Sequence, residues 1–403
     1  MTEATINSYD RKNFSLLMTE TGLSTFATSI FTILILWIAI SETKSALVTG
    51  ITSAMLVAPL ILSILFGAIV DRAASKKVIA IIGPFLKALA ALILLMVIMN
   101  YSLLSDTIFL SISALAFGFS LDILVPIRAI WSQKFLRKPV YLKGMSVANL
   151  VYRTSRLSGF LVAALLLSLS LRTSILAVVS LYLASLLPIL FIDNVKDETI
   201  GRGTLRKVML DGLQYIGRTR IVAEIVFISS FSALFLGMLD TASTVMIERV
   251  FGLSSAYLSY AFFAVSSGAI IGSTITSKLK TVRSVGRKLP IMYGTGGLSL
   301  LFIALIPTIY TLLAVYFIVG ILSGISSPLI SAVLFGTAPR DKMGRIQGAM
   351  DTLGTSFNSV SGLLAGTIMT FEFSGNVFYT MALGLVILSV IVFRFKSLSK
   401  MDI

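Results

Sequence analysis

The chain has 403 residues, of which 56% are hydrophobic and 13% are charged, with a net charge of +15 and a mean hydropathy of +0.97. Soluble domains carry about 25% charged residues, so this composition indicates a membrane protein and excludes a large extramembrane catalytic domain. Cysteine and histidine are both absent, which excludes disulfides, thiol nucleophiles, Cys or His metal sites and histidine proton relays. We expect no cofactor and no bound metal.

Hydrophobic runs of membrane-spanning length recur along the whole chain. A span needs about 20 predominantly apolar residues. Twelve runs meet this requirement, at 14–38, 46–70, 78–99, 107–129, 145–168, 173–192, 220–246, 255–277, 289–308, 311–336, 346–370 and 377–395. The sequence therefore predicts an all-α membrane protein with twelve transmembrane helices.

Basic residues gather at alternate junctions between these runs. Most of the 33 Lys and Arg residues fall on one side of the predicted membrane, and cytoplasmic loops are the ones enriched in Lys and Arg. We therefore expect a multi-pass protein of the cell (cytoplasmic) membrane with both termini in the cytoplasm. This orientation accounts for the basic charge, so no nucleic-acid partner is expected.

The longest polar break divides the chain into two halves. We expect an amino-terminal six-helix bundle at 1–192, a cytoplasmic linker with an amphipathic helix at 193–219, and a carboxy-terminal six-helix bundle at 220–403. The segments 45–50 and 255–260 are similar and precede the second and eighth runs. The halves therefore look like a parallel duplication.

A short motif joins the second and third runs. Gly67, Asp71, Arg72 and Lys76 resemble the G-x-x-x-D-R-x-G-R-K loop of the major facilitator superfamily, although Ala74 replaces its second glycine. Further stretches resemble the macrolide and siderophore efflux branch, whose members are drug:proton antiporters; they lie at 126–128, 156–159, 252–255 and 339–345.

This resemblance implies two six-helix bundles that expose a central cavity alternately to each side of the bilayer. It also implies a gating role for the loop, in which Asp71 caps a helix of the opposite bundle near Arg128. The gating candidates are Gly67, Asp71, Arg72, Lys76 and Arg128.

Five acidic residues lie within the predicted spans; Glu224 and Asp240 lie near the two membrane surfaces, and the other three lie deeper. An ionisable side chain there costs at least about 2.5–3.5 kcal/mol, so it faces a partner or water. Glu20 is the first candidate for a proton carrier, because the first helix lines the cavity in the resembled superfamily. Asp351 and Asp122 are the second and third candidates.

Two cations and an amide share one face of the fifth predicted helix. Asn149, Arg153 and Arg156 are separated by four and three residues. They form either a charge network with Glu20 and Asp122 or a binding surface for an anionic substrate group. Asp240 is a further candidate of this kind, near the outer surface. The position of Lys87 within a span has no explanation at this level.

These observations predict a monomeric secondary transporter that exports small amphipathic organic molecules in exchange for protons. No Walker loop is present to support ATP drive. Two alternatives remain open: a uniporter or exporter of a metal ion or small anion, and an intramembrane enzyme.

Overall fold

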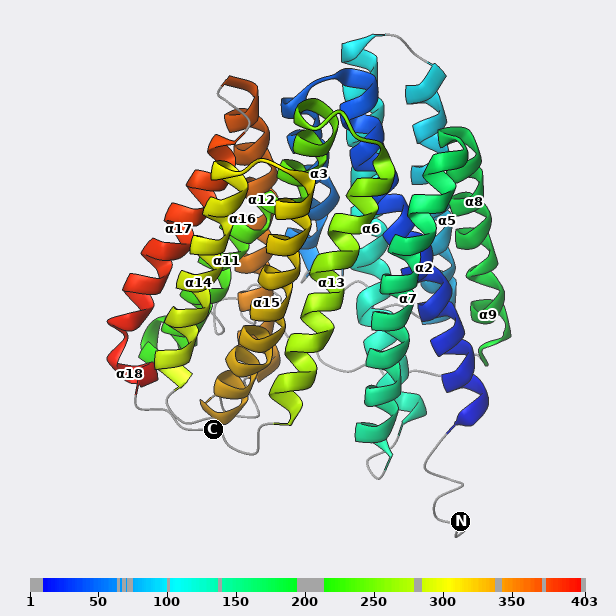
Figure 1. Cartoon of the computed structure of the whole chain (residues 1–403). Helices are drawn as coiled ribbons and strands as arrows, with labels where there is room; N and C mark the ends of the chain where they lie inside the picture. Colours follow the sequence, from blue (N-terminus) through cyan, green and yellow to red (C-terminus); the bar gives the residue numbers. More distant parts are fainter. Residues whose placement is uncertain are drawn as a thin grey trace. The chain divides into compact units, whose positions relative to one another are not determined.

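The computed structural model describes residues 10–63, 66, 70, 75–99, 102–136, 140–193, 214–278, 285–337, 343–371 and 375–399. Its regular elements in this part of the chain are helices (Figure 1). They form two compact units, one of residues 1–38 and 62–202 and the other of residues 39–61 and 203–403.

The first unit is built from α2 and the helices that follow the motif loop. Its elements are the 11–38 part of α2 (Arg11–Thr43), α5 (Lys76–Met99), α6 (Leu103–Phe135), α7 (Tyr141–Leu169), α8 (Leu171–Ala184) and α9 (Leu186–Phe191). α5 packs against α6, α8 and α9, and α7 packs against α8. One buried apolar cluster joins Leu17 of α2 to Ile127 and Trp131 of α6.

The second unit contains the later helices and one early segment. Its elements are α3 (Ala46–Val57), most of the 3-10 helix η1 (Ala58–Leu62), α11 (Arg220–Leu236), α12 (Met238–Val245), the π-helix η2 (Met246–Val250), α13 (Ser255–Ser277), α14 (Val285–Leu305), α15 (Ile309–Thr337), α16 (Met343–Phe371), α17 (Asn376–Phe393) and α18 (Lys396–Ser399). α13 packs on α15, α14 on α17, and both α3 and α11 on α16.

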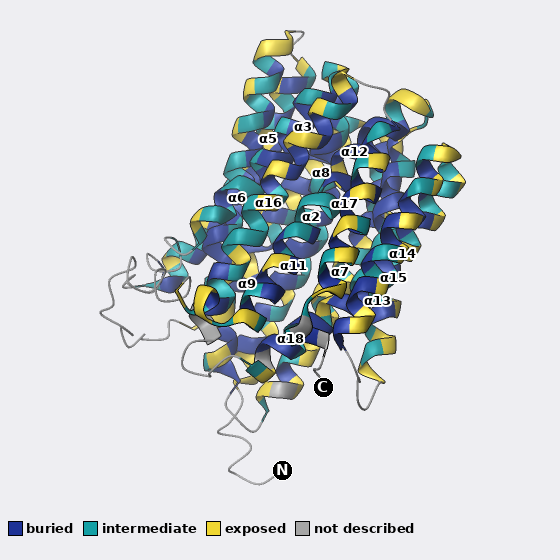
Figure 2. Ribbon diagram, turned by 90° about the vertical axis from the view of Figure 1, so that its left-hand side faces the viewer, coloured by how far each residue is buried: buried dark blue, intermediate teal, exposed yellow. Residues whose placement is uncertain are grey.

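Ten of the described helices are long and apolar enough to cross a membrane. Exposed residues occur along the length of the helices (Figure 2), and large apolar ones such as Leu89, Phe302 and Leu383 are among them, as expected for surfaces that face lipid. The predicted spans at 46–70 and 346–370 fall on α3 with η1 and on α16, which are not among the ten. The total of twelve spans and the cytoplasmic termini stay predictions.

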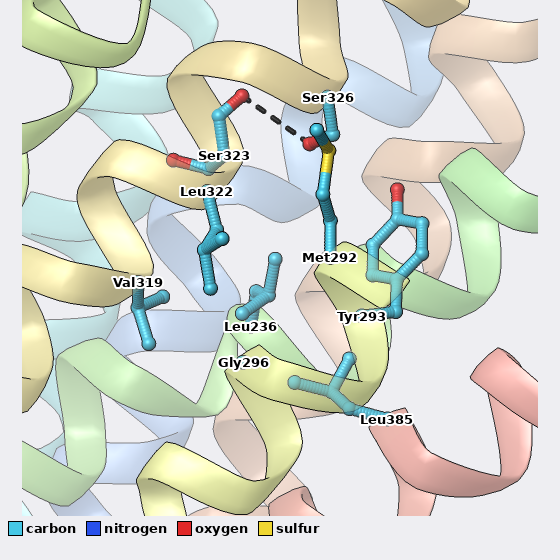
Figure 3. A pocket seen from close by; sticks show the side chains of 9 residues that line it. All are labelled: Leu236, Met292, Tyr293, Gly296, Val319, Leu322, Ser323, Ser326 and Leu385. Atoms are coloured by element: carbon cyan, nitrogen blue, oxygen red, sulfur yellow. Dashed lines mark hydrogen bonds between the residues drawn. The ribbon is translucent and has the colours of Figure 1, made fainter. Parts of the chain in front are cut away.

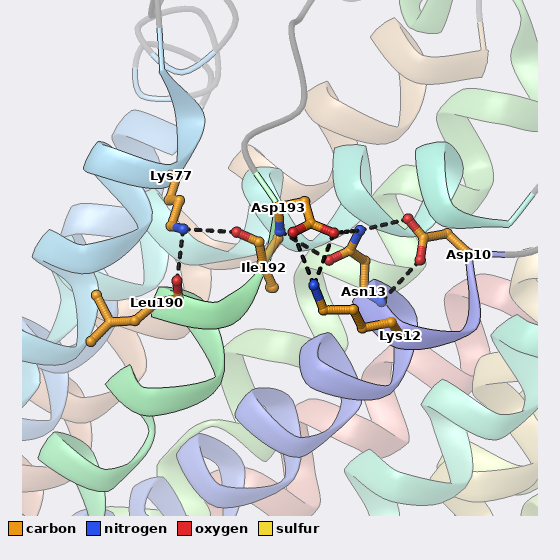
Figure 4. Close-up of polar contacts among 7 residues, drawn as sticks. All are labelled: Asp10, Lys12, Asn13, Lys77, Leu190, Ile192 and Asp193. Carbon is orange, nitrogen blue, oxygen red and sulfur yellow. Dashed lines mark hydrogen bonds and ion pairs between the residues drawn. The ribbon is translucent and has the colours of Figure 1, made fainter.

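Polar contacts close one end of the first unit (Figure 4). Lys77 donates to the backbone oxygens of Leu190 and Ile192 at 2.7 and 2.8 Å, which satisfies carbonyls at the end of α9. Asp193 accepts hydrogen bonds from Lys12 and Asn13. The hydrogen bond from Lys12 is the main reason that the pKa of Asp193 lies below its usual value. These contacts tie the beginning of α2 to the end of α9.

Glycines allow the backbones of α13 and α15 to meet. A Cβ atom added to Gly272 would lie 3.0 Å from the carbonyl carbon of Ile321, and one added to Gly320 would lie 3.0 Å from the Cα of Val265. Small residues at such crossings let membrane helices approach closely. A Cβ atom added to Gly336, also on α15, would have no atom of another described helix within 4 Å.

We expect Gly320→Ala to lower the free energy of unfolding by about 1–3 kcal/mol, because the added methyl group overpacks the crossing. Gly336→Ala is the matched control and should be neutral or stabilising by up to about 1 kcal/mol through helix propensity. Thermal unfolding of both purified variants in detergent would measure the difference. Equal melting temperatures would contradict the role given to the crossing.

Candidate functional site

A buried ion pair joins α2 to α6. Arg128 donates from Nε to Oε2 of Glu20 at 2.9 Å and from Nη2 to Oε1 at 2.6 Å. The Glu20 side chain is 2% exposed and that of Arg128 is 18% exposed. Two parallel hydrogen bonds to both carboxylate oxygens form the strongest type of side-chain ion pair. Glu20 therefore pairs with Arg128, and not with Arg153 or Arg156, which the charge-network alternative gave as its partners.

Lys87 of α5 lies completely buried beside this ion pair. Its Nζ atom donates to the hydroxyl groups of Ser24 at 2.9 Å and Thr28 at 3.4 Å. The same atom lies 5.8 Å from the centre of the Phe117 ring and 5.6 Å from that of Tyr182. Hydroxyl oxygens and aromatic faces both stabilise an ammonium group, so these contacts explain a lysine whose position the sequence left unexplained.

A stripe on α2 provides the polar partners of both cations. Glu20, Ser24 and Thr28 follow one another at intervals of four residues, which places them on one face of the helix. Glu20 pairs with Arg128, while the two hydroxyl groups accept from Lys87. The spacing was visible in the sequence, but Lys87 was not connected to it.

Asp122 of α6 is buried in a different way from Glu20. The residue is 1% exposed, and neither carboxylate oxygen has a hydrogen-bond partner among the residues that the structure describes. An ionised carboxylate without donors bears the full cost of its desolvation. Glu20 and Asp122 therefore occupy opposite electrostatic situations within one unit.

The other acidic candidates lie at exposed positions. Asp351 of α16 is exposed and accepts a hydrogen bond from the Gln347 amide at 2.9 Å. Asp240 of α12 is also exposed, and its backbone oxygen accepts from the hydroxyl group of Thr244.

Three of the five gating candidates, Gly67, Asp71 and Arg72, lie outside the described residues. Residues 194–213 of the linker predicted at 193–219 also lie outside them. Lys76 is buried at the first residue of α5, and Arg128 is held by Glu20.

The three candidates on the fifth predicted helix lie on α7. Asn149, Arg153 and Arg156 are all exposed. The guanidinium carbon of Arg156 lies 5.6 Å from the centre of the Phe160 ring. The structure therefore places these three side chains at the surface of α7 and not in the Glu20 network.

A small pocket lies within the second unit (Figure 3). Ser323 and Ser326 of α15 border it together with Met292 and Tyr293 of α14, and most of the remaining lining is apolar. Its free volume of about 20 Å³ has room for about one water molecule. The pocket is therefore too small to hold an organic substrate.

Long apolar helices with charged groups buried among them are typical of membrane transporters. The Major Facilitator Superfamily model matches residues 17–362, and the chain therefore belongs to this superfamily. A search of curated protein sequences gave no match.

Solved transporter structures share the fold at low sequence identity. The nucleoside transporter NupG matches with a TM-score of 0.73 at 12% identity, covering 95% of this chain and 98% of NupG. A POT family transporter in complex with 5-aminolevulinic acid gives a TM-score of 0.71 at 14% identity, with 98% and 99% coverage. The human organic anion transporter MFSD10 gives 0.63 at 15% identity, with 95% and 99% coverage.

These similarities show that the chain shares its fold with transporters, and its membership of the superfamily indicates a transporter rather than an enzyme. At such identities they do not transfer a substrate. The expected resemblance to the superfamily is confirmed, while the drug-efflux branch stays a prediction.

We expect Glu20→Gln to lower the free energy of unfolding by about 3–5 kcal/mol, because it leaves Arg128 without its carboxylate. Lys87 interacts electrostatically with both members of the pair. Its positive charge therefore also loses the compensating charge of Glu20. Adding Lys87→Met to the Glu20→Gln variant should recover part of the loss by removing one of the two cations. Thermal unfolding in detergent would measure all three proteins, and a Glu20→Gln variant that melts like the wild type would contradict the assignment.

Proposed function

We propose that this chain is a secondary active transporter that exports small amphipathic organic molecules in exchange for protons by alternating access. The observation that carries the coupling is the contrast between two buried carboxyl groups. Glu20 is fixed by two hydrogen bonds from Arg128, whereas Asp122 has no hydrogen-bond partner in the described chain.

A coupling group must bind and release a proton in each transport cycle. Arg128 donates to both oxygens of Glu20 and stabilises its charged form. Asp122 has no such donor, so a bound proton removes the cost of its buried charge and water that reaches the site allows the proton to leave. We therefore place Asp122 ahead of Glu20 as the proton carrier. Asp351 is the weaker candidate because it is exposed.

We expect Asp122→Asn to abolish uphill transport driven by a pH gradient while substrate counterflow continues. Exchange requires binding and the conformational change but no net proton movement. Proteoliposomes with an imposed pH gradient and proteoliposomes preloaded with substrate measure the two activities separately.

Asp106→Asn provides a matched control on the same helix. Asp106 is buried, and its Oδ1 atom has no hydrogen-bond partner in the described chain, but it lies in the first turn of α6. We expect this variant to retain gradient-driven transport. Uphill accumulation by Asp122→Asn would remove Asp122 from the coupling mechanism. A wild type that shows counterflow but no accumulation driven by the pH gradient would favour a uniporter.

Alternating access requires contacts that break and re-form, and we assign this role to contacts around Lys44 in the second unit. Lys44 joins α2 to α3 with a φ of 52°, an uncommon conformation for a residue other than glycine. Its Nζ atom lies 2.6 Å from Oε1 of Glu248 in η2. Arg249 donates to the backbone oxygen of Lys44. We call these three residues the Lys44 clasp.

Close packing continues from the clasp along α3. A Cβ atom added to Gly50 of α3 would lie 2.9 Å from the Cα of Gly366 in α16, and one added to Gly362 would lie 2.9 Å from the Gly50 oxygen. The Ser359 hydroxyl donates to the Ala54 oxygen at 3.0 Å. This contact joins a segment from the first half of the sequence to α16 over several turns. We propose that the clasp and this contact form one gate of the transport cycle.

We expect Glu248→Gln to shift the conformational equilibrium towards the open gate by about two- to fivefold, because a partly exposed ion pair contributes up to about 1 kcal/mol. A cysteine placed at Ala46 in this cysteine-free chain should then react faster with a water-soluble maleimide. Lys12→Gln, which removes a solvent-exposed ion pair to Asp193, is the control. Identical labelling rates in wild type, control and variant would contradict the gating role.

A further inference from the structure

We propose that the exposed polar face of α7 binds an anionic group of the transported molecule, which therefore carries a carboxylate, sulfonate or phosphate. We call Asn149, Arg153 and Arg156 the α7 cationic face. The inference rests on the proposed transport function and narrows its substrate class from amphipathic molecules in general to organic anions.

Three sectors with different surroundings divide the circumference of α7. A helix turns by about 100° per residue, so Val151, Ser155 and Gly159 share the first sector. This sector packs against α2: a Cβ atom on Gly22 would lie 3.4 Å from Val151 and Ser155, and one on Gly159 would lie 2.6 Å from the Phe26 oxygen. The helix is therefore held in a fixed rotation.

The two remaining sectors carry exposed side chains of different chemistry. Asn149, Arg153 and Arg156 lie within about 60° of one another around the axis. Leu150 and Leu161, both exposed, lie together about 90° further round. A leucine surface suits lipid, whereas two arginines require water or an anion. The fixed rotation of α7 assigns the leucine sector to lipid and the cationic face to water or an anion.

The arginines also lie far from both ends of the helix. Arg153 and Arg156 are about 18 and 22 Å along a helix that is about 43 Å long, and they fall within the candidate span Lys143–Leu169. They are therefore too deep to be explained as the basic residues that flank a span.

Neither arginine forms an ion pair with a described carboxylate. Glu20, the acidic residue expected beside them, is occupied by Arg128. The buried ionisable groups described in this unit are Lys76 and Lys87 against Glu20, Asp106 and Asp122. The half-buried Arg128, paired with Glu20, balances the remaining negative charge. The two arginines add an uncompensated positive charge that an anionic ligand neutralises and that repels a cationic one.

The side chains are arranged for bidentate recognition. The guanidinium group of Arg156 lies over the Phe160 ring, and its planar fork matches the oxygens of a carboxylate, sulfonate or phosphate. Asn149 supplies an amide donor one turn from Arg153. Apolar and aromatic neighbours such as Tyr152, also exposed, suit the organic part of the ligand.

Two dyes with the same xanthene ring system, anionic carboxyfluorescein and cationic rhodamine 123, test the charge preference. Fluorescence anisotropy with purified protein in a neutral detergent measures the Kd of each dye. We expect the wild type to bind carboxyfluorescein more tightly than rhodamine 123. The double variant Arg153→Gln/Arg156→Gln should weaken carboxyfluorescein binding at least tenfold, and Arg153→Glu/Arg156→Glu should reverse the preference.

Arg172→Gln is the matched control, because Arg172 is an exposed arginine at the beginning of the next helix. It should bind both dyes like the wild type. An unchanged Kd for carboxyfluorescein in the folded double variant, or a wild type that prefers rhodamine 123, would overturn the proposal. Melting temperatures of all variants identify any loss of folding, and Arg156→Lys, which keeps the charge but loses the fork, should show an intermediate Kd.

An anionic lipid headgroup offers the same chemistry as an organic anion, so a second arm separates the two sources. The proteins are reconstituted in nanodiscs of phosphatidylcholine with and without phosphatidylglycerol. Carboxyfluorescein binding that depends on the arginines in phosphatidylcholine alone supports a substrate site. Stabilisation by phosphatidylglycerol that depends on the arginines, without such dye binding, would overturn the proposal and assign the face to lipid.

Transport in proteoliposomes distinguishes this inference from the proposed function. Arginine-dependent carboxyfluorescein binding without proton-driven accumulation would support the anion site and contradict the coupling. Proton-driven accumulation of rhodamine 123 but not of carboxyfluorescein would leave the transporter in place and overturn the anion site.

Discussion

A charge placed within a bilayer must find a counter-charge, a hydrogen-bond partner or water, because the hydrocarbon core provides none of them. This constraint applies to four ionisable groups of the first unit in turn. Glu20 and Arg128 satisfy each other, and Lys87 is satisfied by hydroxyl groups and aromatic faces. Asp122 is left without a partner in the described chain. The ionisable residues thus separate into those that hold the helices together and those available for transport.

The constraint also explains which parts of the structure could be predicted from the sequence. The length of an apolar run is a local property, so the spans at 78–99 and 255–277 correspond closely to α5 and α13. The partner of a buried charge depends on how two helices are rotated and displaced along each other. That information is not local, and Arg128 was therefore missed as the partner of Glu20. The spacing of Glu20, Ser24 and Thr28 on one helix face can be seen in the sequence. Only the packing of the helices shows that Lys87 donates hydrogen bonds to Ser24 and Thr28.

Helix contacts in the second unit depend on close backbone packing at glycines and not on buried charges. The α13–α15 and α3–α16 crossings bring backbone atoms together at glycine residues, where dispersion forces act over a short distance without side-chain charges. Such surfaces can separate and re-form without leaving an unpaired charge in lipid. The contact of α3 with α16 suits a gate for this reason, with the more exposed Lys44 clasp at its end. The sequence showed the glycines, but not which helix each of them meets.

The two proposals for the first unit have a joint consequence for the direction of transport. If one proton enters through Asp122 while one organic anion leaves from the α7 cationic face, both movements carry positive charge inward. An inside-negative membrane potential contributes about 2.3 kcal/mol per charge for each 100 mV, so it drives both parts of this exchange. Import of the same anion together with one proton would move no net charge and would gain nothing from the potential. An anionic substrate therefore favours export, which agrees with the efflux function proposed from the sequence.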